Sequence, residues 1–241
     1  MAIPRFYCPD PWPADHRVEL PETVARHATG ALRLREGDAL TLFDGQGQEY
    51  PGLLQREGKR LFAVLGPATT PLRESPLAMT LVQGISSGDR MDYTLQKAVE
   101  LGVSEVVPVF MKRSVVRLSD ERLARRHAHW QAIVVAACEQ CGRNHLPTVA
   151  VPCDFDHWLG TPRGDLMLLL DPEAPDSLRT LTTPTGPVFL LAGPEGGFDP
   201  IERRAAMACG ATGVRLGPRV LRTETAAVAA LAAMQVLWGD F

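Results

Sequence analysis

From Leu77 to the end of the chain, short apolar segments alternate with longer segments whose apolar residues recur at helical spacing. The expected buried strands are 77–83, 103–110, 166–170, 188–192 and 214–216, and the expected helices include 91–101, a segment beginning at Pro200, and 223–238. Strands that alternate with helices are typical of a mostly parallel sheet with helices packed on it. The sequence therefore predicts an α/β fold for residues 77–241.

The first 70 residues follow a different pattern, in which short apolar segments are separated by turns. Residues 39–43 lead into Asp44-Gly45-Gln46-Gly47, which favours a hairpin turn because Asp-Gly tolerates positive φ. Residues 61–65 form another expected strand, and this spacing favours a small β-barrel over residues 1–70. Residues 66–76 contain three prolines and are the expected linker between the two domains.

Three of the expected strands of the α/β domain are followed by unusual loops. These loops are Leu170-Asp171-Pro172-Glu173, Gly193 to Gly197, and Gly217 to Arg222. Ligands bind at the carboxyl ends of strands in open α/β sheets, so neighbouring parallel strands would bring the three loops to one site. Each loop taken alone also fits a plain tight turn, but the three together favour a ligand site. Leu191, Leu216 and Leu221 are expected to supply an apolar wall for a flat ring.

Several common site motifs are absent from the sequence. Neither G-x-x-x-x-G-K-[ST] nor G-x-G-x-x-G occurs, which disfavours a P-loop nucleotide site and an ordinary dinucleotide site. No Ser-His-Asp or Cys-His nucleophile is evident, which favours a transfer reaction in which the ligand brings its own reactive group. Cys138 and Cys141 have C-x-x-C spacing without a second pair, so we expect them to pack in a helix and expect no metal.

Charge and cysteine usage bear on location and partners. The net charge is −3, so no general positive field indicates a nucleic-acid partner. Residues 112–126 nevertheless carry six positive charges against two negative ones, which fits either a solvated helix face or a strip that contacts phosphates. The absence of a long apolar run and the five cysteines, an odd number, favour a cytoplasmic protein without a membrane segment.

Two C-terminal segments, LLAGPEGGFDPIE and LGPRVLRTETA, resemble motifs of the bacterial 16S ribosomal RNA uridine N3-methyltransferase family, which belongs to the SPOUT superfamily of knotted methyltransferases. The segments IPRFYCP, LRLREGDALTLFDG, LQKAVELGV and AACEQCGRN match as well, so the resemblance covers nearly the whole chain. It implies an N-terminal PUA-like β-barrel that binds RNA and a C-terminal α/β domain with a deep trefoil knot. It also implies S-adenosyl-L-methionine as cofactor, a homodimer whose active site borrows from both subunits, and 16S ribosomal RNA in the small subunit or its precursor as substrate.

The same resemblance assigns cofactor residues by position. They are Leu170, Leu191, Gly193, Glu195, Gly196, Gly197, Leu216, Gly217 and Leu221. The glycines are expected to make room for a cofactor held by backbone amides and carbonyls.

Catalytic and RNA-binding residues follow from the resemblance too. Arg222 is expected to stabilise the uracil anion that develops as N3 loses its proton, since a guanidinium stays protonated and cannot act as the base. The alternative for Arg222 is an ion pair with Glu224 at the helix start. Glu224 is a second catalytic candidate as proton acceptor, or it favours the helix N-terminus. The residues expected to position RNA are Arg5, Arg33, Arg113, Arg143 and Asn144.

Two rival functions remain open at the level of sequence. One is a sister knotted methyltransferase that acts on a ribose 2′-oxygen or on another base, which would keep the glycine loop. The other is a non-catalytic RNA-binding or assembly module that has lost cofactor binding. A measurement of cofactor binding in solution distinguishes the non-catalytic module, which would not bind the cofactor, from the two kinds of methyltransferase.

Overall fold

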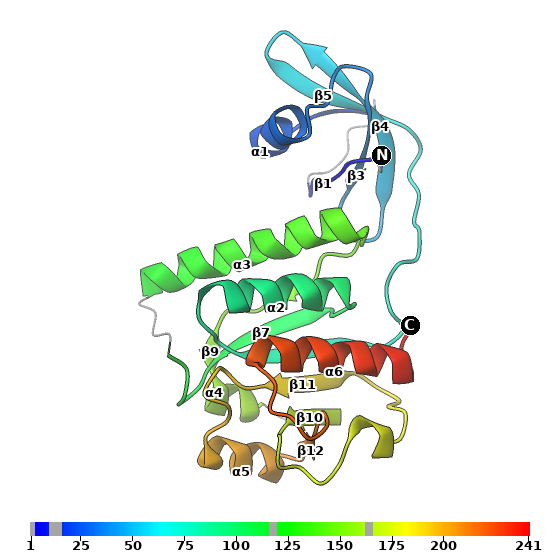
Figure 1. The fold of residues 1–241 in the computed structure, drawn as a ribbon. Helices are drawn as coiled ribbons and strands as arrows, with labels where there is room; N and C mark the ends of the chain where they lie inside the picture. The colour runs from blue at the N-terminus through cyan, green and yellow to red at the C-terminus, as the bar shows by residue number, and fades with distance from the viewer. Residues whose placement is uncertain (1–2, 10–15, 116–119, 162–165) are drawn as a thin grey trace. The chain divides into compact units, whose positions relative to one another are not determined.

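The computed structural model describes residues 3–9, 16–115, 120–161 and 166–241 (Figure 1). The chain divides into two compact units. The first contains Met1–Glu74 together with Cys138–Leu146, and the second contains Ser75–Ala137 and Pro147–Phe241. The segment Cys138–Leu146 thus lies in the first unit, although the sequence places it well inside the second expected domain.

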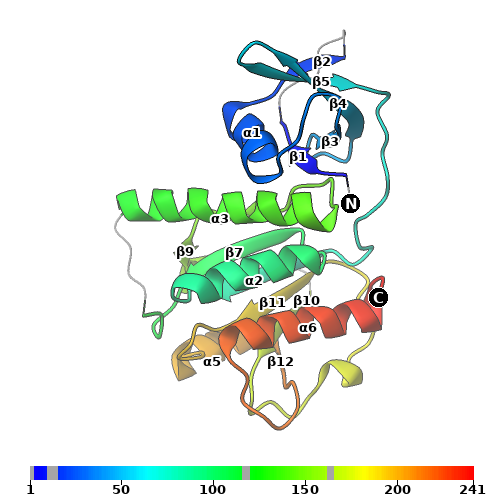
Figure 2. The ribbon, with the colours of Figure 1, turned by 45° about the horizontal axis from the view of Figure 1, so that its top comes forward.

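The first unit is built on a five-stranded sheet within the described residues (Figure 2). Its strands are β1 (Arg5–Tyr7), β2 (Arg17–Glu19), β3 (Ala39–Phe43), β4 (Glu49–Glu57) and β5 (Arg60–Leu65), in the order β1-β3-β4-β5-β2. The β1–β3 pair is parallel and the other pairs are antiparallel. Helix α1 (Glu22–Arg26) continues into a π-helical turn, His27–Ala31. The predicted turn joins β3 to β4, with Gly45 and Gly47 at φ values of 78° and 106°.

The second unit contains a parallel sheet, as the strand–helix alternation predicts. Its strands are β6 (Met79–Gly84), β7 (Glu105–Phe110), β8 (Thr148–Val149), β9 (Cys153–Asp154), β10 (Leu166–Leu170), β11 (Val188–Ala192) and β12 (Thr212–Val214). The order is β12-β10-β11-β6-β7-β8, and β9 also pairs with β7. All of these pairs are parallel, so the strands end at the same edge of the sheet.

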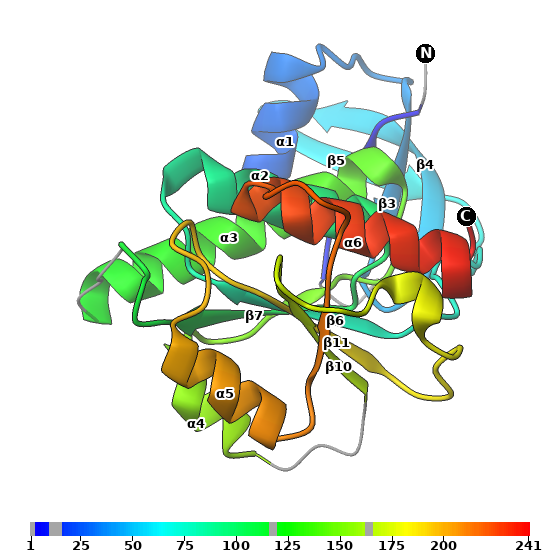
Figure 3. The same ribbon diagram turned by 60° about the horizontal axis from the view of Figure 1, so that its bottom comes forward.

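Helices cover both faces of this sheet (Figure 3). They are α2 (Gly88–Glu100), α3 (Asp120–Cys141), α4 (Phe155–Leu159), α5 (Pro200–Ala208) and α6 (Thr223–Trp238), with a short 3₁₀ helix at Leu178–Thr180. Helices α2 and α6 lie on one face, and α4 and α5 lie on the other. Side chains of β11 alternate between the faces, and Leu191 joins Phe155, Trp158 and Ala206 in the core under α4 and α5.

The start of α5 forms as its sequence predicts. Asp199 is the N-cap and accepts a hydrogen bond from the backbone N–H of Ile201 at 2.9 Å, and Pro200 occupies the first helical position. Glu202 completes the capping box by accepting from the Asp199 N–H at 3.1 Å. Because α5 begins here, the chain between β11 and α5 is confined to the short glycine loop.

No helix in the described part of the chain is long and apolar enough to cross a membrane.

Candidate active site

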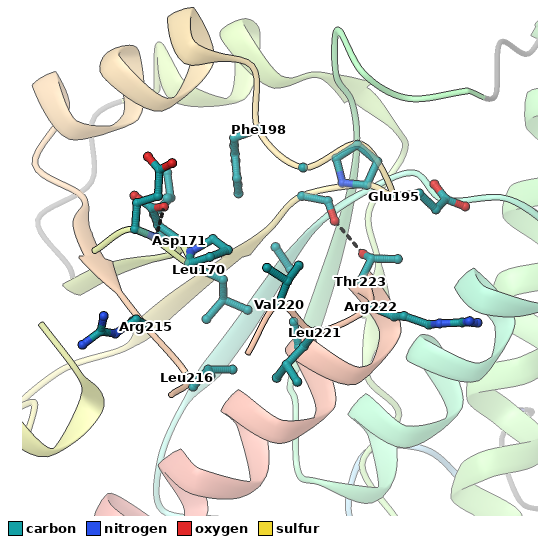
Figure 4. Close-up of a pocket in the computed structure, with 18 of the residues that line it drawn as sticks. Leu170, Asp171, Glu195, Phe198, Arg215, Leu216, Val220, Leu221, Arg222 and Thr223 are labelled. Atoms are coloured by element: carbon teal, nitrogen blue, oxygen red, sulfur yellow. Dashed lines mark hydrogen bonds between the residues drawn. The ribbon is translucent and has the colours of Figure 1, made fainter. Parts of the chain in front are cut away.

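A pocket of about 860 Å³ lies at the carboxyl ends of β10, β11 and β12 (Figure 4). These strands are neighbours in the sheet, with β10 between β11 and β12, so the loops that follow them meet at one edge. The pocket is lined by residues 169–173, 192–198 and 214–224, together with Arg90, Arg113, Pro200, Arg203 and Ala226. The three loops that the sequence singles out therefore converge on one cavity.

All of the predicted cofactor residues except Leu191 line this pocket. Leu191 is fully buried and its side chain packs in the core under α4 and α5. The period of two along β11 explains the difference, since Leu191 and its neighbour Ala192 face opposite sides of the sheet. Leu170, Leu216 and Leu221 give the pocket an apolar wall, as Figure 4 shows.

The glycine loop, residues 193–197, packs closely against the protein itself. A Cβ at Gly196 would lie 2.8 Å from the Cβ of Arg113, and a Cβ at Gly193 would lie 3.0 Å from the carbonyl carbon of Gly197. Gly197 has a φ of +67° and open space at the position of a Cβ. Two of the glycines thus allow the loop to fold tightly, and the third adopts a left-handed conformation beside free space.

Glu195 ties the glycine loop to the start of α2. Its Oε1 accepts hydrogen bonds from the backbone N–H of Ser87 at 2.8 Å, the Ser87 hydroxyl at 2.7 Å and Arg90 at 3.0 Å. Partial burial raises the pKa of the Glu195 carboxyl, but the hydrogen bonds from Ser87 and Arg90 outweigh burial and lower this pKa to about 2. In Figure 4 the carboxylate points away from Leu170 and Leu216, so its visible role is to anchor the loop.

Thr223 and Gln83 fix the other end of the same loop. The Thr223 hydroxyl donates a 2.6 Å hydrogen bond to the carbonyl oxygen of Gly193. Nε2 of Gln83 donates to the same carbonyl at 3.3 Å and to the Thr223 hydroxyl oxygen at 3.2 Å. Gln83 is fully buried at the end of β6, and Thr223 is the first residue of α6. The loop, a central strand and the start of α6 therefore share one hydrogen-bond network.

The two predicted catalytic residues stand at the start of α6 and both line the pocket. Arg222 is the N-cap residue, its side chain is exposed, and no ion pair with Glu224 is present in the structure. Glu224 lies in the first turn, and its Oε2 is buried without a hydrogen-bond partner in the described chain. Thr223 sits between them and fixes the backbone that carries both side chains.

Comparison with known proteins identifies the family to which the chain belongs. The family model described as "RNA methyltransferase domain" matches residues 73–235, and that described as "RNA methyltransferase PUA domain" matches residues 20–65. The ribosomal RNA small subunit methyltransferase E of Buchnera aphidicola is 30% identical, over 99% of this chain and 95% of its own. The chain belongs to this RNA methyltransferase family.

Two solved structures match this chain over its whole length. The ribosomal RNA small subunit methyltransferase E of Neisseria gonorrhoeae, bound to S-adenosyl methionine, is 43% identical with a TM-score of 0.92, over 100% of both chains. A Legionella pneumophila methyltransferase in complex with the same cofactor is 36% identical with a TM-score of 0.95, again over 100% of both chains. The parallel sheet of the second unit and the small sheet of the first thus have the architecture of this methyltransferase family.

The residues expected to position RNA in this family member fall into two groups. Arg5 forms a 2.5 Å ion pair with Glu49, and its side chain is 12% exposed. Arg143 is 5% exposed and pairs with Glu74, and Asn144 is fully buried and donates to the carbonyls of Gly47 and Pro71 at 2.8 and 3.0 Å. These three residues hold the segment Cys138–Leu146 within the first unit. Their side chains are occupied by these internal contacts, while Nε of Arg5 and Oδ1 of Asn144 are buried without a hydrogen-bond partner in the described chain.

Arg33 and Arg113 form the second, exposed group. Arg33 has an exposed side chain and a φ of 56°, a left-handed conformation that is uncommon outside glycine. Arg113 lines the pocket of the methyltransferase unit and donates a 3.1 Å hydrogen bond to the carbonyl oxygen of Gly196. Arg33 has no such bond among the interactions of the described residues.

An ion pair in the pocket wall was not anticipated from the sequence. Asp171, at the end of β10, is buried, and its Oδ2 lies 2.5 Å from Nη2 of Arg203 on α5. Its Oδ1 accepts from the backbone N–H of Glu173 at 2.9 Å, which holds the loop after β10. The motif Asp171-Pro172-Glu173 indicates this loop in the sequence. Its partner Arg203 lies 32 residues further along the chain, on α5, and no local pattern indicates the pairing.

The two cysteines with C-x-x-C spacing differ in environment. Cys138 is fully buried, and burial raises the pKa of its thiol to about 12, whereas Cys141 is exposed. Among the described residues, no group of three or more His, Cys, Asp or Glu side chains is placed to hold a metal ion.

Proposed function

We propose that this protein transfers a methyl group from S-adenosyl-L-methionine to N3 of a specific uridine in 16S ribosomal RNA. The observation that carries the proposal is the convergence of the GPEGG and LGPRVLRTE segments on one pocket in a chain of this family. The Buchnera and Neisseria relatives named above are ribosomal RNA small subunit methyltransferases E, and the two solved relatives contain S-adenosyl methionine.

The pocket has the features that this cofactor requires. Leu170, Leu216 and Leu221 offer apolar contact to a flat ring, and the backbone of residues 193–197 offers polar groups beside the open space at Gly197. The buried Oε2 of Glu224, which has no hydrogen-bond partner in the described chain, is an acceptor available to a ligand. When bound, the cofactor supplies an already activated methyl group, so the protein needs no nucleophile of its own.

The chain's own residues then have to orient the uracil and manage the proton of N3. Arg222 is exposed at the pocket and has no acidic partner among the described residues, so its guanidinium is free to stabilise negative charge on the uracil oxygens. We assign Glu224 as the candidate acceptor for the N3 proton, since this residue lies in the first turn of α6 and lines the same pocket. Proximity and orientation can supply on the order of 7–11 kcal/mol in well-ordered sites.

We assign RNA binding to the PUA-like unit, within residues 1–70, and cofactor binding and dimerisation to residues 77–241. Arg33 is the first-unit candidate for RNA contact, since it is exposed and lies in one of the resembling segments. The substrate is 16S ribosomal RNA in the small subunit or its precursor, which places the reaction in the cytoplasm. A homodimer and a deep trefoil knot in the second unit complete the proposal, and both rest on the resemblance to the SPOUT superfamily.

The experiment that tests the function is methylation of small ribosomal subunits from a strain that lacks this gene. Purified protein and S-adenosyl-L-methionine are added, and the RNA is digested to nucleosides and analysed by mass spectrometry. Formation of 3-methyluridine supports the proposal. A ribose 2′-O-methyl nucleoside would assign the protein to the sister methyltransferases instead, and calorimetry without cofactor binding would favour the assembly module.

A further inference from the structure

Most charged side chains around the pocket are paired with one another. Arg90 lies 3.0 Å from Glu195, Arg113 lies 3.9 Å from Asp199, and Arg203 lies 2.5 Å from Asp171. Each of these pairs joins two different elements of the second unit. Each pair partly offsets the charge of its arginine, although the side chains of Arg90, Arg113 and Arg203 are 44%, 46% and 40% exposed.

The loop that follows β12 is different, because it carries unpaired positive charge. Arg215, Arg219 and Arg222 all lie within it, line the pocket and have exposed side chains. None has an acidic partner within 4.0 Å in the part of the chain that the structure describes. The whole chain has a net charge of −3, so a basic composition does not explain this concentration of charge.

This loop is held at both ends, so its arginines are presented from a fixed backbone. At the start, the backbone N–H of Arg215 donates to the carbonyl oxygen of Asp176 at 2.9 Å. At the end, Thr223 is bonded to the glycine loop at 2.6 Å. Between them, Gly217 has a φ of 78° and is followed by Pro218, which restricts the backbone further. A loop fixed in this way loses little conformational entropy when it binds a partner.

Figure 4 shows how the charges lie around the apolar part of the loop. Arg215 and Arg222 lie on opposite sides of Leu216 and Leu221. The guanidinium of Arg215 points away from these leucines, so it is directed past the wall of the cofactor site. Because Leu216 and Leu221 belong to the wall of the cofactor site, the cations on both sides of them fit the anionic phosphates of a nucleotide strand that approaches the bound cofactor.

We propose that Arg215 and Arg219 are RNA-positioning residues that bind backbone phosphates of the strand next to the methylated uridine. This inference rests on the proposed function, because it takes ribosomal RNA as the substrate. The guanidinium group suits the task, since its planar set of donors matches two phosphate oxygens at once. Arg222 remains the arginine assigned to the uracil itself.

The other source of an anion at this pocket is the carboxylate of the cofactor. A single carboxylate occupies at most one guanidinium in a bidentate pair, and three arginines share this loop. The exposed side chains of Arg215 and Arg219 also favour an extended partner outside the pocket over a small molecule inside it. The two sources predict different results when affinity for each ligand is measured separately.

The test uses the full-length protein with Arg215→Gln and Arg219→Gln. Arg204→Gln is the matched control, because Arg204 is an exposed arginine on α5 that does not line the pocket. RNA affinity is measured by filter binding with small ribosomal subunits from a strain lacking this gene, at several salt concentrations, since RNA within the subunit is the proposed substrate. Affinity for S-adenosyl-L-methionine is measured by calorimetry, and the methylation rate of the wild type on the same subunits is measured in parallel.

We expect each variant to raise the Kd for RNA about threefold to fivefold at low salt, as for a partly exposed charge pair. The slope of log K against log salt should become shallower by about 0.7 for each phosphate of single-stranded RNA that the variant no longer neutralises. The cofactor Kd should stay at the wild-type value, and Arg204→Gln should change neither quantity.

Wild-type RNA affinity and salt slope in both variants would overturn the inference, and so would a raised cofactor Kd with unchanged RNA affinity, which would assign these arginines to the carboxylate. A wild-type protein that binds the subunits but does not methylate their RNA would overturn the proposed function and leave the phosphate contacts to be judged by the binding data alone.

Discussion

The hydroxyl of Thr223 donates a 2.6 Å hydrogen bond to the carbonyl oxygen of Gly193, which joins the first residue of α6 to the first residue of the glycine loop. Arg222 directly precedes Thr223, so this bond sets the backbone of the candidate catalytic arginine against the loop expected to hold the cofactor. Gln83 reinforces the bond by donating to both partners. The glycine loop and the backbone that carries Arg222 are thus joined through the one hydroxyl of Thr223.

Thr223→Val should therefore lower kcat and have smaller effects on the free energy of unfolding and on the affinity for the cofactor. Valine keeps the shape of threonine but cannot donate to Gly193, and the loss of one hydrogen bond costs about 0.5–1.5 kcal/mol of unfolding free energy. We expect kcat to fall about tenfold, which corresponds to about 1.4 kcal/mol in the activation barrier. Thermal unfolding, calorimetry with the cofactor and steady-state methylation measure the three quantities.

Thr223→Ser is the matched variant, since it retains the hydroxyl and should restore most of kcat. If Thr223→Val methylates at the wild-type rate, the bond does not position Arg222. If kcat falls only in parallel with cofactor affinity in both variants, Thr223 serves the loop alone.

Gly196→Val should abolish cofactor binding by displacing the glycine loop. A Cβ at this position already lies 2.8 Å from the Cβ of Arg113 and 3.2 Å from its carbonyl oxygen, so a branched side chain cannot be accommodated without backbone movement. Gly197→Ala has open space but a φ of +67°, so we expect a smaller loss, of about 1 kcal/mol in unfolding free energy. Calorimetry with S-adenosyl-L-methionine and thermal unfolding compare the two, and equal loss of binding in both variants would contradict this ranking.

The sequence predicted much of the fold because its signals are local. Apolar runs located the longer strands, and Asp199 with Glu202 located the start of α5. Strands β8 and β9 are only two residues long and produced no recognisable pattern. The return of Cys138–Leu146 to the first unit depends on bonds such as that between Asn144 and Gly47, which are 97 residues apart and leave no periodic signal.

The candidate site was predictable to the extent that it depends on loop position. Neighbouring parallel strands bring their following loops together, so Leu170, Gly193 and Leu216 could be grouped from the sequence. The position of Leu191 in the motif did not reveal that its side chain packs in the core, because one residue along a strand changes the face of the sheet. Burial of Arg5 and Arg143 was hidden as well, since their partners Glu49 and Glu74 lie far away in sequence.

Glu195→Gln should destabilise the protein at neutral pH and have less effect in acid. The pKa of Glu195 is lowered to about 2 in the folded protein, from 4.5 as the ordinary value. A lowered folded-state pKa contributes stability that is fully present above the unfolded value and is lost as the pH falls toward 2. The difference in melting temperature between wild type and Glu195→Gln should therefore be constant from pH 8 to about pH 5 and should shrink below about pH 4.5.

Denaturation at pH 7 and at pH 3, with Glu173→Gln as a control, measures this dependence. Glu173 is an exposed glutamate, and its partner Arg203 is held more closely by Asp171. A wild-type advantage that stayed the same at pH 3 would show that Glu195 does not act as an anion.

Arg143→Ala and Arg33→Ala should affect different properties. The first should lower the stability of the fold, and the second should weaken RNA binding. Arg143 is 5% exposed and paired with Glu74, and removal of one partner of a buried pair costs up to about 3–5 kcal/mol of unfolding free energy. Glu74 is 30% exposed, so we expect a loss toward the lower end of this range. Arg33 is exposed, so its removal should leave the melting temperature unchanged and weaken RNA binding. Unfolding by urea and filter binding measure the two effects, and an unchanged RNA affinity in Arg33→Ala would remove it from the RNA-contacting residues.

Arg222→Ala should retain cofactor binding and lose methyl transfer. The side chain is exposed at the pocket and has no ion pair with Glu224, so its removal should cost little stability. A preorganised donor that stabilises developing charge typically contributes about 10²–10³ in kcat, and we expect a loss in this range. Arg222→Lys keeps the charge but not the planar set of donors, so it should recover only part of the activity. Single-turnover methylation at saturating S-adenosyl-L-methionine measures the chemical step, and calorimetry confirms that the cofactor site is intact. Full activity in Arg222→Ala would assign stabilisation of the uracil anion to another residue, and loss of cofactor binding in Arg222→Ala would place this arginine in the cofactor site instead.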